Sequence, residues 1–308
     1  MRIFVTGASG WIGSAVVPEL LNAGHEVVGL ARSDDAEVRL EAAGAEALRG
    51  DLDDLGSLRA GAENSDGVIH LAFKHDLASS PDGFAKAAAS ERQSMEAIGE
   101  ALAGSDRPLV IASGTPAVPG RVATESDEAG AVGPAALRGA NARAAIALAE
   151  RGVRSSVVRL PRSVHGEGER HGFIARLIAI AREKGVSGYV GDGSSRWPAV
   201  HVLDAAHLFC LAVEKAPAGT VLHGVGDEAV PTREIAEVIG RHLSLPTASA
   251  AADQFGFLGM ILAGDQPASS TQTRKLLGWR PVHPGLIADL EAGHYFALAP
   301  EAQARSDA

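Results

Sequence analysis

The chain has 308 residues, of which 46% are hydrophobic, 21% charged and 4% aromatic. Such a composition can build a packed core and excludes a disordered chain. Acidic residues outnumber basic ones by 38 to 28, giving a formal net charge of −10, and no basic run is interleaved with aromatic residues. We therefore expect no nucleic-acid partner.

Cysteine usage and the apolar runs indicate the compartment. The single cysteine, Cys210, excludes a disulfide framework and a cysteine-based metal cluster, and it fits a small buried apolar side chain. No run of about 18 apolar residues occurs, and the N-terminus lacks the apolar segment of a signal peptide, so we expect no membrane span. The prediction is a soluble cytoplasmic protein.

Short apolar runs alternate with helical segments over residues 1–160. The runs are four to six residues long and rich in Val, Ile and Leu, which is typical of strands buried on both faces of a parallel sheet. They cover Ile3–Thr6, Glu26–Leu30, Gly67–Ala72, Leu109–Ser113 and Ser155–Leu160. The alternation predicts an α/β fold, a Rossmann-type doubly wound parallel sheet.

Six helices are expected from the periodicity, and the pattern changes after residue 160. The helices are Ser14–Ala23, Glu91–Ala103, Asn141–Arg151, Phe173–Lys184, Thr232–Leu243 and Pro284–Ala292. A strand and a helix within Ala199–Glu214 precede a strand near Val221–Gly224. We predict a first domain of residues 1–160, to which 199–224 return, and a smaller C-terminal region of residues 161–198 and 225–308.

A glycine-rich turn joins the first strand to the first helix, reading Thr6-Gly7-Ala8-Ser9-Gly10-Trp11-Ile12-Gly13. In such a turn the first glycine permits the bend, the second lets backbone approach a pyrophosphate, and the third lets helix and strand pack closely. Free N–H groups and the helix dipole then hold the phosphates. We expect a dinucleotide to bind at Gly7, Ser9, Gly10, Trp11, Ile12 and Gly13.

The end of the second strand indicates which dinucleotide binds. An NAD site places a carboxylate there for the ribose 2′-hydroxyl. This chain reads Leu30-Ala31-Arg32-Ser33, and a guanidinium with a hydroxyl suits a 2′-phosphate. We therefore predict NADP(H), bound by Arg32 and Ser33. The alternative is that Arg32 is a solvated surface charge and that Asp34 or Asp35 reads the ribose.

Several motifs in order resemble the extended short-chain dehydrogenase/reductase superfamily, in its NAD(P)-dependent epimerase/dehydratase group. The similar segments are Thr6 to Gly13, Gly50-Asp51-Leu52, His70-Leu71-Ala72, Gly191-Asp192-Gly193 with Arg196, Val200 to Asp204, and Leu276 to Pro281. The resemblance covers nearly the whole chain. It implies that the first domain binds the cofactor, that the second forms a substrate-binding lid, and that Asp51, Leu52, Leu71, Ala72, Lys74, Arg143 and Pro161 contact the cofactor.

The catalytic residues of that superfamily are only partly present. Thr115 fits the position of its catalytic hydroxyl, but neither tyrosine, Tyr189 or Tyr295, has a lysine four residues later. In the equivalent window Arg143 can replace the lysine, Gly139 stands where a second basic residue is expected, and nothing supplies the phenol. The chain resembles an atypical subgroup in which basic residues replace the Tyr/Lys pair.

Three side chains are candidates for donating the proton. His75 follows the strand at Gly67–Ala72, at the edge where doubly wound folds bind ligands. His165 replaces a tyrosine common in the superfamily and is expected near the nicotinamide, and we favour it slightly. Tyr189 precedes a glycine loop, and solvent or Thr115 is the remaining alternative. His201 and His207 lack the spacing of a metal site, so no metal is predicted.

The function predicted from these residues is an NADPH-dependent oxidoreductase that transfers hydride to a small carbonyl, imine or activated alkene. Few aromatic residues are available to stack on a nucleotide sugar. One alternative is an NAD(P)-dependent epimerase/dehydratase. The other is a non-catalytic NADPH-binding regulator, and the missing tyrosine favours this second alternative. A small-molecule substrate is the expected partner, and a homodimer is left open.

Overall fold

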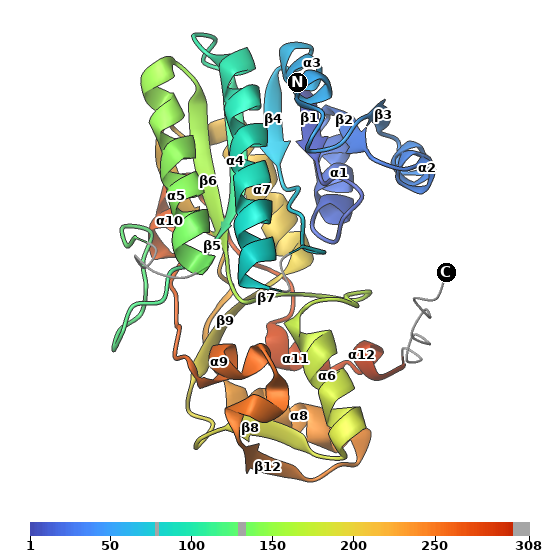
Figure 1. Ribbon diagram of the computed structural model, residues 1–308, viewed down its shortest axis with the longest axis vertical. Coiled ribbons are helices and arrows are strands. Elements are labelled where there is room, and N and C mark those ends of the chain that lie inside the picture. The colour runs from blue at the N-terminus through green and yellow to red at the C-terminus, as the bar shows by residue number, and fades with distance from the viewer. Residues whose placement is uncertain (78–79, 129–133, 298–308) are drawn as a thin grey trace.

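The computed structural model describes residues 1–77, 80–128 and 134–297 and divides into two lobes (Figure 1). The larger lobe contains a parallel sheet of seven strands in the order β10-β6-β5-β4-β1-β2-β3. Its strands are β1 (Arg2–Thr6), β2 (Glu26–Ala31), β3 (Glu46–Arg49), β4 (Gly67–His70), β5 (Pro108–Gly114), β6 (Arg154–Leu160) and β10 (Thr220–His223). The α/β, Rossmann-type prediction is confirmed.

Helices cover both faces of this sheet, as the unbroken apolar strands require. They are α1 (Gly13–Asn22), α2 (Asp34–Ala42), α3 (Leu55–Glu63), α4 (Pro81–Leu102), α5 (Pro134–Ala147) and α7 (Val202–Lys215). One apolar cluster joins β1, β5 and β6 to α1, α2 and α7, and another joins the opposite face to α3, α4 and α5. In Figure 1 the N-terminal ends of α4 and α5 point toward the smaller lobe.

The smaller lobe has its own sheets and core. Strands β7 (Ser163–His165), β9 (Arg196–His201) and β11 (Asp227–Pro231) form one sheet, and β8 (Ser187–Val190) pairs with β12 (Thr247–Ala250). Its helices are α6 (Phe173–Lys184), α8 (Thr232–Leu243), η2 (Ala252–Phe255), α9 (Leu258–Ala263), α11 (Leu286–Glu291) and α12 (His294–Ala297). Trp197 and Tyr295 anchor a separate apolar cluster there.

Three features differ from the sequence-based expectations. Strand β3 was not predicted, because its Glu46-Ala47-Leu48-Arg49 segment is short and has only two apolar residues, both half-buried. The strand expected at the start of Ala199–Glu214 pairs with β7 and β11 in the smaller sheet, whereas α7 and β10 lie in the larger lobe. A segment from Thr271 also returns there: α10 (Thr271–Leu277) leads to Trp279, which is buried in the cluster of the larger lobe.

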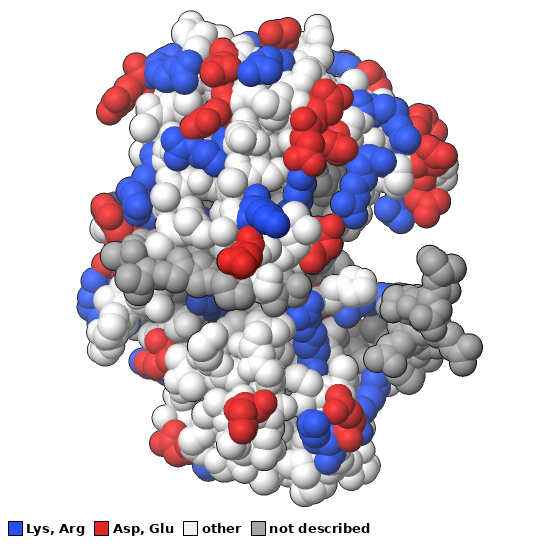
Figure 2. Space-filling view, in the orientation of Figure 1, with Lys and Arg blue, Asp and Glu red and all other residues white. Residues whose placement is uncertain are grey.

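Figure 2 shows acidic and basic side chains interspersed over the larger lobe, without a continuous basic patch on the face in view. In the smaller lobe, around α9, most of the visible surface is uncharged. Within the described residues, no helix combines the length and the apolar character that crossing a membrane requires.

Candidate functional site

The turn between β1 and α1 has a backbone that only glycine can follow at two positions. Gly7 has φ +69°, and a Cβ there would lie 2.8 Å from the backbone N of Ala72. A Cβ on Gly13 would lie 2.1 Å from the carbonyl O of Gly7 and 2.7 Å from the carbonyl C of Ala8. Because these neighbours are backbone atoms, they cannot move aside, and the turn stays pressed against the start of α1 and the end of β4.

Gly10 is less confined than Gly7 and Gly13. A Cβ there would have one close neighbour, the carbonyl O of Gly7, at a tight 3.2 Å, and the residue is exposed. Among the described residues no side chain caps α1, whose N-cap residue is Ile12. An exposed glycine turn at an uncapped helix N-terminus is a geometry that can receive a pyrophosphate. The turn therefore fits a dinucleotide cofactor.

Trp11 and Thr6 fix the two sides of this turn. The indole Nε1 of Trp11 donates to the carbonyl O of Val164 at 2.8 Å, which ties the turn to β7 of the smaller lobe. Thr6 accepts a hydrogen bond from the backbone N of Leu71 at its carbonyl O and from that of Ala72 at its Oγ1. Ser9 is half-buried in the turn. The predicted contact residues of β1 and β4 thus lie together at one sheet edge.

His70, the last residue of β4, is buried beneath this edge. Its Nδ1 lies 2.8 Å from Thr6 Oγ1, and its Nε2 is buried without a hydrogen-bond partner among the described residues. Burial, and secondarily the charge of Arg138, lowers the pKa of His70 to about 4. The imidazole is therefore neutral at physiological pH.

The end of β2 carries an exposed guanidinium. Within the described residues, Arg32 has no ion-pair partner, whereas the neighbouring Asp34 lies 3.1 Å from Arg49. The Ser33 hydroxyl accepts a hydrogen bond from the backbone N of Ala36 as the N-cap of α2, which leaves its O–H free to donate.

The segments after β3 and β4 meet through an ion pair. Lys74 Nζ lies 2.5 and 2.6 Å from the two carboxylate oxygens of Asp53, and this hydrogen bonding lowers the pKa of Asp53. Asp51 accepts from the backbone N of Asp53 and of Asp54, and Leu52 is buried. Lys74, predicted to contact the cofactor, therefore has its charge matched by a carboxylate of the chain.

A buried polar network lies where β5 meets α4 and α5. Arg138 Nη2 donates to the carbonyl O of Ala112 at 2.8 Å and lies 2.9 Å from Glu91 Oε1, and its Cζ lies 4.5 Å from the ring centroid of Phe73. Asn141, one turn later on α5, donates to Glu91 Oε2 at 2.8 Å. Burial raises the pKa of Glu91, against the opposing effects of Arg138 and Asn141.

The residues of the predicted catalytic window lie around this network. Thr115 follows β5, is half-buried, and donates its backbone N–H to the carbonyl O of Leu160 at 3.0 Å. Pro161 is buried directly after β6. Arg143 is exposed on α5, with its Nη1 3.9 Å from Glu128. The guanidinium that reaches the end of β5 is therefore that of Arg138 rather than Arg143.

Comparison with known proteins identifies the family. The model of the NAD dependent epimerase/dehydratase family matches residues 3–223. The chain belongs to this family. It is 45% identical over 302 residues, 96% of this chain and 100% of the relative, to "Uncharacterized protein C2A9.02" of Schizosaccharomyces pombe.

Two further likenesses bear on the site of this family member. It is 28% identical to the 2-alkyl-3-oxoalkanoate reductase of Stenotrophomonas maltophilia, over 76% of this chain and 73% of that protein. The structure of MoeE5 in complex with UDP-glucose and NAD superimposes with a TM-score of 0.75 at 26% identity, covering 96% of this chain and 98% of that one.

The two histidines proposed as proton donors lie in different surroundings. The surface of His75 is exposed, and its ring lies edge-on to the Phe73 ring, with 5.0 Å between the centroids. Desolvation by the surrounding protein atoms, followed by the charge of Arg138, lowers the pKa of His75. His165 is fully buried, and its Nδ1 lies 2.8 Å from Asp289 Oδ2. The imidazole of His165 thus packs inside the smaller lobe, and its role as a proton donor near the nicotinamide stays a prediction.

The two histidines weighed as metal ligands have hydrogen-bonding partners within the chain. His201 Nδ1 accepts from the backbone N of Leu203 at 3.2 Å, and His207 Nδ1 lies 2.7 Å from Glu19 Oε1. The absence of a metal remains a prediction.

At the amino end of β2, away from the cofactor turn, one donor atom from each of His25, Cys210 and Glu214 lies within 4.8 Å of the others. His25 Nε2 and Glu214 Oε1 already pair at 3.1 Å. Burial of the thiol, followed by the negative charges of Glu214 and Glu19, raises the pKa of Cys210 to about 12. The thiol is therefore protonated and is not poised to bind a metal.

Sequence reasoning gave no role to Arg138, Glu91 or Asn141. A signal was available: Arg138 and Asn141 are three residues apart in an alanine-rich helix, and so share one face. What the sequence did not reveal is that this face meets Glu91 of α4.

Proposed function

We propose that this chain is an NADPH-dependent oxidoreductase that transfers hydride to a small carbonyl, imine or activated alkene. The glycine turn, with Gly10 exposed at the uncapped N-terminus of α1, is the observation that supports the proposal. A nicotinamide cofactor supplies the hydride when bound. The chain must then bind the cofactor, orient the substrate and stabilise the negative charge that develops on the reduced group.

The choice of NADPH rests on the end of β2. Ala31 stands where an NAD site has a carboxylate, and Arg32 offers a guanidinium that no carboxylate of the described residues compensates. Asp34, one of the two alternatives for reading the ribose, has its carboxylate 3.1 Å from Arg49. A fork of N–H donors beside the Ser33 hydroxyl suits a phosphate better than a hydroxyl group.

The roles proposed at the reacting end follow from chemical type and from the family resemblance. In this proposal Thr115 donates a hydrogen bond to the substrate oxygen, and Arg143, exposed on α5, contacts the cofactor ribose. Arg138, fixed by Ala112, Glu91 and Phe73, provides a positive field at the end of β5. The proton comes from His75 or from solvent, because His165 has no open surface.

An epimerase or dehydratase acting on a nucleotide sugar is the second candidate, and the family and the UDP-glucose complex of MoeE5 support it. One observation opposes it. Arg196, which follows the Gly191-Asp192-Gly193 turn, bonds to Asp265 through Nε at 2.9 Å and Nη2 at 2.7 Å. The bidentate fork of this guanidinium thus faces Asp265 rather than a diphosphate, although its Nη1 remains outside that pair.

Cofactor binding and cofactor oxidation, measured separately, test the proposal. The protein is titrated with NADPH by its tryptophan fluorescence, then incubated with NADPH and a panel of carbonyl compounds while the absorbance of reduced nicotinamide is followed. Binding with oxidation supports a reductase. Binding without oxidation on any panel member supports the regulator. A parallel incubation with UDP-glucose in place of the carbonyl panel tests the second candidate, which formation of an epimerised or dehydrated nucleotide sugar without net oxidation supports.

Substitutions at Thr115 and Arg143 separate turnover from cofactor binding. Thr115→Ala should lower kcat by about 10²-fold with little effect on the KM for NADPH, because the hydroxyl acts on the developing charge. Arg143→Ala should raise the KM for NADPH. Unchanged kinetics in both variants would show that the reaction takes place elsewhere in the cleft.

A further inference from the structure

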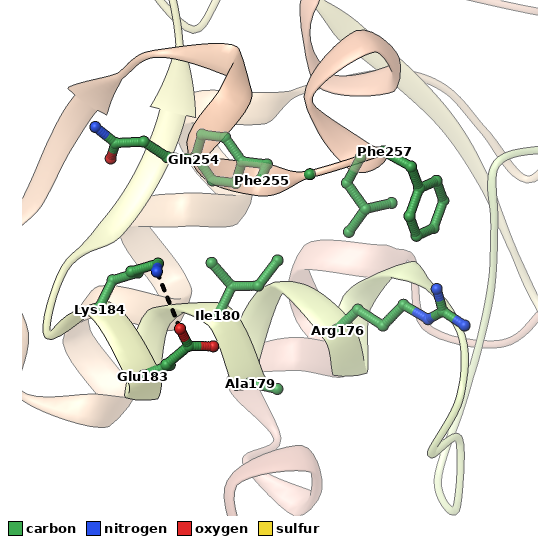
Figure 3. Close-up of a pocket in the computed structure, with 10 residues that line it drawn as sticks. Arg176, Ala179, Ile180, Glu183, Lys184, Gln254, Phe255 and Phe257 are labelled. Atoms are coloured by element: carbon green, nitrogen blue, oxygen red, sulfur yellow. Dashed lines mark hydrogen bonds and ion pairs between the residues drawn. The ribbon is translucent and has the colours of Figure 1, made fainter. Parts of the chain in front are cut away.

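A groove of about 460 Å³ runs along α6 in the smaller lobe (Figure 3). One face of α6 buries Ile174, Leu177, Ile178 and Ala181 in the core. The face bearing Arg176, Ile180 and Lys184, at intervals of four residues, is instead open and forms one wall of the groove.

Phe255, Phe257 and Leu258 form the facing wall, between η2 and α9. Phe255 is buried against Gly188 of β8, where a Cβ would lie 2.7 Å from its ring, so this wall is fixed. Phe257 remains 52% exposed. An exposed phenylalanine above a half-buried isoleucine leaves apolar surface that a ligand can cover.

The charges at the two ends of the groove differ. Lys184 Nζ lies 2.9 Å from Glu183 Oε1, so its charge is compensated. Arg176 has no carboxylate partner within the described part of the chain, and its Cζ lies over the Phe257 ring, 5.1 Å from the centroid. In Figure 3 Arg176 and Lys184 occupy opposite ends, with Ile180 between them. The Arg176 end therefore attracts an anion.

The Arg176 end also lies toward the cofactor turn. A Cβ on Gly168, in the loop that leads into α6, would lie 3.8 Å from the indole of Trp11. Arg176 is in the first turn of α6. Its charge is a smaller contributor, after burial and Arg138, to the lowered pKa of His75 on the other lobe.

We propose that this groove binds the apolar chain of an anionic substrate, with a carboxylate at Arg176 and the chain running past Ile180 and Phe257 toward Lys184. This inference rests on the proposed function in one respect: the chain leads away from the cleft in which hydride transfer takes place. It specifies the substrate as a carbonyl compound that carries a carboxylate and an alkyl or aryl chain.

The groove sets the length of that chain. Arg176 and Lys184 are eight residues apart on α6, which is about 12 Å along a helix. With C–C bonds of about 1.5 Å, an extended chain of roughly eight to ten carbons spans this distance. Longer chains gain no further contact with the groove.

Direct binding of plain carboxylates tests the groove without turnover. Sodium butanoate, hexanoate, octanoate, decanoate and dodecanoate are titrated by calorimetry into the full chain, with octan-1-ol as the uncharged match to octanoate. We expect one site per chain, affinity rising about twofold to fourfold per added methylene up to roughly ten carbons, and octanoate binding better than octanol.

Three variants locate the site. Arg176→Met should weaken octanoate about tenfold and leave octanol unchanged. Ile180→Asp should abolish the dependence on chain length, and Ile180→Ala, a milder change, should reduce it if the aspartate variant does not fold. Arg182→Met is the matched control, because the Arg182 guanidinium donates to the carbonyl O of Phe296 and does not line the groove; it should bind octanoate like the parent.

Affinity independent of chain length, or octanoate binding equally to the Arg176→Met variant and the parent, would overturn the groove proposal. These titrations contain no NADPH. If the carboxylates bind as expected and no carbonyl compound is reduced, the reductase proposal fails and the groove stands. If short carbonyl compounds are reduced and no carboxylate binds, the groove alone fails.

Discussion

Replacing His70 by asparagine should change how the stability of the protein depends on pH. The imidazole is buried and neutral, with a pKa lowered from 6.5 to about 4 by burial and then by Arg138. In the unfolded chain it takes up a proton near pH 6.5, whereas the folded protein resists protonation until about pH 4. Its contribution is therefore complete above pH 6.5 and is lost as the pH falls toward 4, amounting to roughly 3 kcal/mol in all.

The difference between parent and variant isolates this one group. Urea unfolding of both proteins between pH 7.5 and pH 5 should show the free energy of unfolding of the parent falling by roughly 2 kcal/mol more than that of His70→Asn. His201 and His223, whose pKa values burial also lowers, titrate in both proteins and cancel. A difference between the two proteins that stays constant with pH would refute the view that His70 is held neutral.

Three further predictions concern the cofactor and the proton. Gly13→Ala should destabilise the fold by about 3 kcal/mol or more in urea unfolding, because its Cβ would lie 2.1 Å from a backbone oxygen, whereas Gly10→Val, whose Cβ contact is 3.2 Å, should destabilise it less and lose NADPH affinity in a fluorescence titration. Arg32→Ala should weaken NADPH by about 1.5–3 kcal/mol and leave NADH unchanged; an equal loss for both would contradict the 2′-phosphate assignment. If His75 donates the proton, reduction should slow as the pH rises through a value below 6.5, and His75→Asn should remove that dependence.

The central sheet could be predicted because its strands are buried on both faces. Residues such as Ile3, Val5 and Val110 form unbroken apolar runs of strand length, and such runs are typical of a parallel sheet covered by helices. The prediction began this helix at Glu91, whereas α4 begins at Pro81, because the first ten residues offer few large apolar side chains: the buried ones, Ala87 and Ala88, are small. Strand β3 was not predicted for a related reason: it lies at the edge of the sheet, and its two apolar side chains are only half-buried.

The parts of the site that a local backbone turn specifies could be predicted from the sequence. The parts that depend on contacts between distant segments could not. The spacing of Gly7, Gly10 and Gly13 encodes a turn that local geometry alone specifies. The buried imidazole of His165 pairs with Asp289, 124 residues away, and no sequence pattern predicts a contact between these two side chains. The resemblance therefore placed that imidazole near the nicotinamide without showing that the ring packs against Asp289 inside the smaller lobe.

The proposed reduction and the oxidation with which an epimerase or dehydratase begins make different demands on the end of β5. Oxidising a hydroxyl requires a base, and a histidine with a lowered pKa, such as His75, is a weak one. Reduction builds negative charge on the substrate oxygen, and in the proposed reaction the Thr115 hydroxyl and the Arg138 guanidinium stabilise that charge. The Nη2 of Arg138 donates to the carbonyl O of Ala112 and also lies 2.9 Å from Glu91 Oε1, so Glu91 holds the guanidinium at the end of β5 and offsets part of its charge. Under this proposal the proton that completes the reduction comes from His75 or from water.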